Sequence, residues 1–134
     1  MSKNANAALG HYRSVGAYGA AAAESRMQLV LRMMEGARDR IAAARGQMQR
    51  KETGAKGESI KKAIGLIDGL RASLDREQGG EIAVNLESLY DYMTRRLVEA
   101  NLGDRPELLD EVSGLLEEIR SAWQQISLTE SQPA

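Results

Sequence analysis

Apolar residues recur every three to four positions in four stretches of the chain, at about residues 24–50, 58–77, 81–101 and 108–126. That spacing places them on one side of an α-helix, at about 100° per residue. The connections between the stretches are short, which favours antiparallel neighbours. The pattern predicts an all-α fold, an antiparallel up-and-down four-helix bundle.

Each stretch carries its own apolar stripe, and these stripes are the predicted core. The first stripe consists of Met27, Val30, Leu31, Met34, Ala37, Ile41, Ala44 and Met48. The second consists of Ile60, Ala63, Ile64, Ile67, Leu70 and Leu74. The fourth consists of Leu108, Val112, Leu115, Leu116, Ile119, Trp123 and Ile126.

Turn-forming residues mark the predicted connections between the helices. Residues 51–57 contain two glycines and no apolar anchor, which predicts the first loop. Gly79-Gly80 is expected to end the second helix with a left-handed cap, because glycine has no Cβ to be strained there. Residues 104–107 have the D-x-x-E spacing of a capping box, with Pro106 in the first turn of the fourth helix.

The two ends of the chain lack the helical pattern. We expect a short mobile N-terminal segment at residues 1–22, a helical bundle at residues 23–128 and a disordered tail at residues 129–134. Leu9, Tyr12 and Val15 have the spacing of a short apolar segment that would cover a groove until a partner displaces it. The alternative is a solvated tail, as termini often are.

The third stretch is more apolar than a bundle helix needs. Its core stripe is Ile82, Leu86, Leu89, Met93, Leu97 and Ala100. Side chains that widen the stripe to roughly 180° of the helix are Ala83, Tyr90 and Tyr92. Further apolar residues on the opposite side are Val84, Val98 and Leu102. Two interpretations stay open: a wide core face with a few surface valines, or half of a groove that binds a partner.

Composition excludes several classes of function. The chain has 18 basic and 19 acidic residues and no basic stripe, so we expect no nucleic-acid partner. It has no cysteine and one histidine, His11, which excludes a cysteine or histidine metal cluster, and no cofactor is expected. No apolar run approaches the roughly 20 residues of a membrane span, and the N-terminal residues lack the continuous apolar region of a signal peptide, so none is expected. We therefore expect a cytoplasmic protein without membrane insertion.

Candidate acid–base residues are equally scarce. Adjacent carboxylates such as Glu117-Glu118 lie on the polar side of an amphipathic helix, where a solvated surface explains them. No phosphate-binding glycine loop is present. The chain is therefore not expected to be an enzyme.

The segment SLDREQGGEIAVNLESLYDYMTRRLVEAN, residues 73–101, is more specific than a generic helical hairpin. It resembles the FliS family, the export chaperones of bacterial flagellin, whose hairpin has the form SLD-x-E-x-GG-E-IA-x-NL followed by LYDYM-x-x-RL-x-x-AN. The resemblance runs from about residue 9 to residue 126 and includes Arg120 and Trp123 in the family's Arg-x-x-Trp. Departures, such as Tyr12-Arg13 where the family often has Tyr-Gln, lie in the N-terminal half.

The resemblance implies a cytoplasmic helical bundle that binds the disordered C-terminal segment of flagellin. Such a chaperone prevents premature polymerisation and assists delivery to the flagellar type III export gate. Helix position and motif together give these expected partner-binding residues: Tyr12, Val15, Leu66, Leu70, Val84, Leu86, Tyr90, Tyr92, Met93 and Leu97. The chain is expected to be a monomer or weak homodimer. The alternative is a structural bundle that homo-oligomerises through its apolar face.

Overall fold

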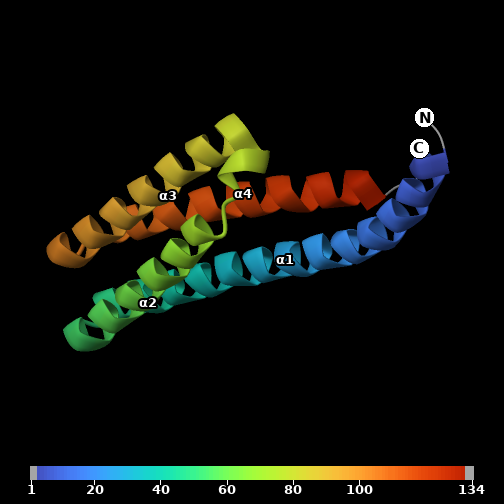
Figure 1. Ribbon diagram of the computed structural model, residues 1–134. Coiled ribbons are helices and arrows are strands. Elements are labelled where there is room, and N and C mark those ends of the chain that lie inside the picture. Colours follow the sequence, from blue (N-terminus) through green and yellow to red (C-terminus); the bar gives the residue numbers. More distant parts are fainter. Residues whose placement is uncertain (1–2, 132–134) are drawn as a thin grey trace. The chain divides into compact units, whose positions relative to one another are not determined.

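The computed structural model describes the backbone of residues 3–131 and the side chains of residues 25–125. Its helices are α1 (Lys3–Gln49), α2 (Thr53–Ala72), α3 (Arg76–Gly103) and α4 (Pro106–Ser131). The described residues contain no strand, and consecutive helices run in opposite directions (Figure 1). The prediction of an all-α four-helix bundle is confirmed.

The chain divides into two compact units, residues 1–31 and residues 32–134. The first unit contains the N-terminal part of α1, so the predicted helix start near Glu24 is wrong. Leu9, Tyr12 and Val15 fall in this unit, and their side chains lie outside the described residues. The mobile N-terminal segment and the disordered tail stay predictions. The second unit holds the rest of α1 together with α2, α3 and α4.

The core of the second unit is formed largely by the predicted stripes. From α1 and α2 it takes Met34, Ala37, Ile41, Ala44, Met48, Ile60, Ala63, Ile67 and Leu70. From α3 and α4 it takes Ala83, Tyr90, Met93, Leu97, Ala100, Leu108, Leu109, Val112, Leu116 and Ile119. Helix α3 packs against both α2 and α4, which explains why its buried face is wide (Figure 1).

Burial along the predicted stripe of α3 decreases toward its N-terminal end. Met93 and Leu97 are fully buried and Leu86 is half-buried, but Ile82 is 64% exposed, so its assignment to the core is wrong. The reason lies in α2, which ends at Ala72. Its last turn is opposite Asp91, and the earlier turns of α3 extend past it.

The corner between α2 and α3 differs from its prediction. The second helix ends at Ala72 and not at the glycine pair. Asp75 caps a new helical turn, because its carboxylate accepts hydrogen bonds from the backbone N–H of Glu77 at 3.2 Å and of Gln78 at 3.0 Å. Gly80 has φ 51° and ψ −124°, which kinks the backbone between this turn and the long part of α3. A positive φ at the glycine pair is thus confirmed, but it marks a kink rather than the end of α2.

The other two connections are shorter than predicted. Helix α2 begins at Thr53, so most of the predicted loop at residues 51–57 is helical, and Lys51 reverses the chain with φ 59°. The capping box at residues 104–107 is not formed. Asp104 instead ends α3 in the left-handed conformation, and its carboxylate accepts a hydrogen bond from the ammonium group of Lys56.

Arginines on the apolar side of α1 pair with acidic residues of α4. Arg45 makes two hydrogen bonds to Asp110, at 2.8 and 3.1 Å. Arg38 lies 2.6 Å from Glu117, which also accepts two hydrogen bonds from Arg120. These bonds, with the charges of Arg120 and Arg38, lower the pKa of Glu117 to about 2. Charged side chains therefore tie the edge of the core where α1 meets α4.

Substituting the kink glycine should destabilise the fold. In Gly80→Ala a residue with a Cβ would have to adopt the positive φ of this position, which such residues rarely do. The free energy of unfolding should fall by about 1–3 kcal/mol. The matched control is Gly65→Ala in the interior of α2, where a Cβ meets nothing within 4 Å. The free energy of unfolding of that variant should rise by about 0.5–1 kcal/mol, because alanine favours a helix interior over glycine. Urea denaturation measures both, and equal stabilisation by the two alanines would contradict the kink.

The pairing of Glu117 makes part of the stability acid-sensitive. Its pKa of about 2 lies below the unfolded value of about 4.3, so its charge stabilises the fold above pH ~4.3 and loses this effect as pH falls toward 2. Glu117→Gln should therefore lower the melting temperature at pH 7 and differ little from the unmodified chain near pH 2. Thermal unfolding followed by circular dichroism between pH 2 and pH 7 measures this difference. The control is Glu118→Gln, which changes the exposed neighbouring carboxylate. A constant difference at every pH would be the contrary result.

Candidate partner-binding surface

A groove between α2 and α3 is lined mainly by apolar side chains. Its volume is about 180 Å³, and its walls are Gly57, Ile60, Lys61, Ile64, Val98, Asn101 and Leu102. The residues of α2 are three or four positions apart, as are those of α3, so each set lies along one side of its helix. Gly57 adds no side chain to the wall and keeps this end of the groove open.

The groove continues into apolar side chains that face solvent. Val98 is 44% exposed and Leu102 is 81% exposed. Val84, which is 58% exposed, lies about 21 Å from Val98 along α3, beyond the exposed Asp91 and Arg95, and is separate from the groove. Burying apolar surface of this kind against a partner would stabilise the complex by about 25 cal/mol for each Å² removed from water. A patch of this kind beside a groove is typical of a surface that binds another polypeptide.

The predicted partner-binding residues divide by burial. Val84 is exposed, and three others are half-buried: Leu66, Leu86 and Tyr92. Four belong to the closed core: Leu70, Tyr90, Met93 and Leu97. Burial raises the pKa of Tyr90 to about 12, so its phenol stays neutral. The core residues would reach a partner only if the bundle opened.

None of the expected partner-binding residues lines the groove, whose apolar side chains are Ile60, Ile64, Val98 and Leu102. The signal was present in α3, because Val98 and Leu102 are apolar and lie four residues apart on the side opposite the core. In α2 the signal was absent, since Ile60 and Ile64 belong to the same stripe as the core residues. Only the position of α3 beside α2 makes them a wall of the groove.

Tyr92 takes part in a polar cluster between α3 and α4. Its hydroxyl donates a hydrogen bond to Glu111 Oε2 at 2.7 Å and accepts one from Arg96 Nε at 2.9 Å. The guanidinium carbon of Arg96 also lies 5.2 Å from the centre of the tyrosine ring. Arg96 Nε is 3.0 Å from Glu111 Oε1, but its proton is directed at Tyr92 and leaves that oxygen without a hydrogen bond. The cluster fixes the rotation of α3 against α4.

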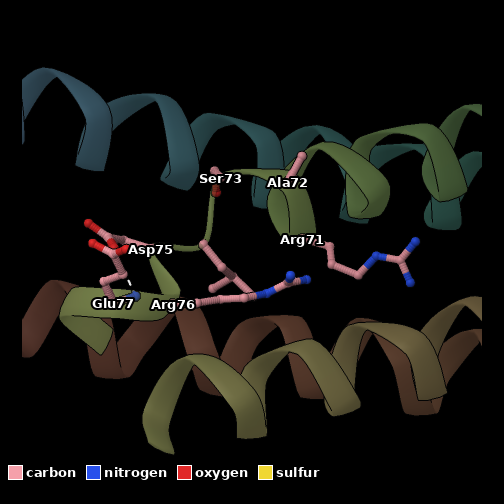
Figure 2. A pocket seen from close by; sticks show the side chains of 7 residues that line it. Arg71, Ala72, Ser73, Asp75, Arg76 and Glu77 are labelled. Carbon is pink, nitrogen blue, oxygen red and sulfur yellow. Dashed lines mark hydrogen bonds between the residues drawn. The ribbon is translucent and has the colours of Figure 1, made fainter. Parts of the chain in front are cut away.

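A second hollow, of about 460 Å³, lies at the corner between α2 and α3 and is lined by residues 71–77. Figure 2 shows the side chains of Arg71 and Arg76 extending to one side and the carboxylates of Asp75 and Glu77 gathered on the other. Both arginines are in ion pairs with α3: Arg71 lies 3.9 Å from Asp91, and Arg76 pairs with Glu87. The hollow therefore has paired charges of both signs and few apolar walls.

Lys56 holds one end of the groove in place. Its side chain is 5% exposed, and its ammonium group donates hydrogen bonds to the backbone carbonyl of Asn101 at 2.9 Å and to Asp104. A buried cation needs such partners, because losing water is costly. The contacts join the first turns of α2 to the last turn of α3, where Gly57 and Asn101 line the groove.

Within the residues whose positions are described, no group of three or more acidic or histidine side chains is arranged to hold a metal ion. In the same part of the chain, no helix combines the length and apolar character needed to cross a membrane.

Comparison with known proteins places the chain among flagellar proteins. A family model described as "Flagellar protein FliS" matches residues 8–130. The chain is 53% identical over 100 residues to the flagellar secretion chaperone FliSB of Pseudomonas aeruginosa. The matched region covers 75% of this chain and 79% of that protein. It is 46% identical over 117 residues to the flagellar secretion chaperone FliS of Salmonella typhimurium, which covers 87% of each. With the protein of that name from Bacillus subtilis it shares 33% over 98 residues, 73% of this chain and 72% of the relative.

Replacing the buried lysine should loosen the end of the groove. Lys56→Met keeps the aliphatic stem but leaves the Asn101 carbonyl and the Asp104 carboxylate without their donor. The free energy of unfolding should fall by about 1–2 kcal/mol. Lys61→Met, an exposed lysine on the same helix, is the control and should change stability by less than about 0.5 kcal/mol. Urea denaturation measures both, and equal effects would mean that Lys56 is solvated.

Proposed function

Because the chain belongs to the FliS family of flagellar proteins, we propose that it is a flagellar secretion chaperone that binds the disordered C-terminal segment of flagellin. It acts in the cytoplasm, prevents premature polymerisation of flagellin and assists its delivery to the type III export gate. The relatives are named as chaperones and not as enzymes. The observation that carries the proposal is the apolar groove between α2 and α3.

The physical task of such a chaperone matches that groove. A flagellin segment that later forms filament core is amphipathic, and its apolar side must be covered while it waits for export. An amphipathic helix that lies in a groove places side chains at i, i+3, i+4 and i+7 against apolar walls. Ordering the segment costs conformational entropy, which burial of apolar surface on both partners offsets.

The exposed side chains are the proposed points of contact. Val98 and Leu102 form one wall, with Ile64 opposite on α2. The half-buried predicted residues lie outside this contact: Leu66 lies against Gly36 of α1, Tyr92 bonds Glu111 of α4, and Leu86 does not line the groove. The proposed contact requires no opening of the core. Leu9, Tyr12 and Val15 stay proposed as a cover that the partner displaces.

Titration calorimetry with a peptide of the cognate flagellin's last few dozen residues tests the proposal. Binding should show a negative heat-capacity change, because apolar surface is buried. No heat at high peptide concentration, from a chain that circular dichroism shows to be folded, would rule the function out.

A matched pair of leucine variants locates the site within the same experiment. Leu102→Ser removes an 81% exposed side chain from the groove and should weaken binding by about ten- to a hundredfold, since burying a leucine contributes roughly 1.5–3 kcal/mol to the binding free energy. Leu29→Ser removes a 57% exposed leucine from α1 and should leave affinity unchanged. Equal losses would place the contact elsewhere.

A further inference from the structure

Two glycines let α1 and α2 approach closely at one edge of the core. A Cβ on Gly69 of α2 would overlap the terminal methyl group of Met33 of α1. A Cβ on Gly36 of α1 would lie 3.2 Å from Cδ1 of Leu66 of α2. The side chains of Met33 and Leu66 therefore each fill the space that a glycine leaves on the facing helix.

The two contacts are reciprocal. On each helix the large side chain stands three residues before the glycine, Met33 before Gly36 and Leu66 before Gly69. Because α1 and α2 run in opposite directions, this spacing sets each large side chain opposite the glycine of the other helix. We call these four residues the glycine seam. All four are half-buried, so the seam lies where solvent reaches the edge of the core.

Met33 differs from the other methionines of the second unit in its exposure to solvent. Met34 and Met93 are fully buried, and Met48 is 9% exposed. The oxidation of a methionine depends on whether an oxidant can reach its sulfur. Met33 is therefore the methionine of this unit that a dissolved oxidant reaches while the bundle stays folded.

We propose that Met33 is a site of reversible oxidation and that its sulfoxide opens the glycine seam. A peroxide supplies the oxygen atom: its O–O bond breaks, an S–O bond forms on the thioether, and water leaves. The sulfur is oxidised by two electrons and the peroxide is reduced by two. A methionine sulfoxide reductase reverses the step and releases the oxygen as water, while two thiols become a disulfide.

The sulfoxide does not fit the place of the thioether. The space beside Gly69 is bounded by the backbone of α2, whose N–H groups already donate within the helix. The added oxygen would lack a donor there, and an unpaired polar atom away from water is unfavourable. The oxidised side chain must then turn into solvent, which empties the space beside Gly69 and separates α1 from α2 at this edge.

The opening of the seam also affects the groove. Helix α2 contacts α1 through the glycine seam and packs against α3. It supplies Ile60 and Ile64 to the wall of the groove, so a loosened α2 should bind the partner more weakly. This consequence rests on the proposed function, whereas the oxidation of Met33 and the opening of the seam do not.

Peptide mapping after mild treatment with hydrogen peroxide tests the site. Cleavage by trypsin after Arg32 and Arg38 places Met33 and Met34 in one peptide, and fragment masses distinguish the two. Met33 should be oxidised at least about tenfold faster than Met34, because reactivity follows exposure. Met34 is the matched control, since it has the same chemistry at the adjacent position. Equal rates at the two positions, or a Met33 that stays reduced while Met48 reacts, overturn the proposal.

Gly69→Ala tests whether the thioether fills the space beside the glycine. The new Cβ should displace the flexible end of Met33 into solvent and speed its oxidation about threefold or more. Gly65→Ala, one turn earlier on α2, adds a Cβ that meets nothing within 4 Å and should leave the rate unchanged. Equal rates in the two variants overturn the placement of Met33 in the glycine seam.

Thermal unfolding followed by circular dichroism tests the opening of the seam. Peroxide treatment should lower the melting temperature of the unmodified chain by about 4 °C or more, and methionine sulfoxide reductase should restore it. Met33→Leu keeps an apolar side chain without sulfur and should lose this sensitivity. Met27→Leu removes the half-buried methionine of the first unit and should keep it. Equal sensitivity of the Met33→Leu and unmodified chains overturns the proposal.

Titration calorimetry with the flagellin peptide separates this inference from the proposed function. The oxidised chain should bind the peptide about fivefold more weakly than the reduced chain, and oxidised Met33→Leu should bind it as the reduced chain does. A peptide that binds both forms of the unmodified chain equally overturns the link between the seam and the groove and leaves the chaperone function standing. A peptide that binds neither form removes the chaperone function, and the melting temperatures still decide the oxidation site.

Discussion

Helix α3 packs between α2 and α4, and Met93 and Leu97 lie fully buried along the seam that faces them. Burying this seam fixes how α3 is rotated about its own axis. Polar contacts at its two edges hold the same rotation: Arg71 reaches Asp91 on the α2 side, and Tyr92 bonds Glu111 on the α4 side. In a helix of 3.6 residues per turn, one buried side dictates the opposite exposed side. Val84 and Leu102 therefore face solvent although they are apolar.

The periodicity of the sequence predicted most of the core, because burial in a bundle follows the side of the helix on which an apolar residue lies. Every predicted stripe residue of α1 from Met34 to Met48 is buried. The ends of the helices were predicted less well. Lys51 and Asp104 adopt positive φ although neither is glycine, and the carboxylate expected to cap α4 bonds Lys56 from a distant helix. Ile82 fits the period but lies beyond the end of α2. Contacts between helices decide these positions, and local sequence does not encode them.

The candidate site was predictable in the same partial way. The surplus of apolar residues on the third stretch indicated a surface beyond what packing needs, and Val84, Val98 and Leu102 are exposed. Its other wall, Ile60 and Ile64, looks like core in the sequence of α2 alone. A groove arises where two such helices meet. We propose that a flagellin segment covers its apolar surface.

We propose that a flagellin segment binds the groove between α2 and α3 without opening the core. Amide chemical shifts of the isotopically labelled chain, followed during titration with the flagellin C-terminal peptide, test this mode of binding. The largest shift changes should fall on Gly57–Ile64 of α2 and Val98–Leu102 of α3, while the amide protons of Met93 and Leu97 should exchange slowly with solvent. Fast exchange at Met93 and Leu97 in the complex, with changes spread through the core, would contradict it and mean that the bundle opens to bind.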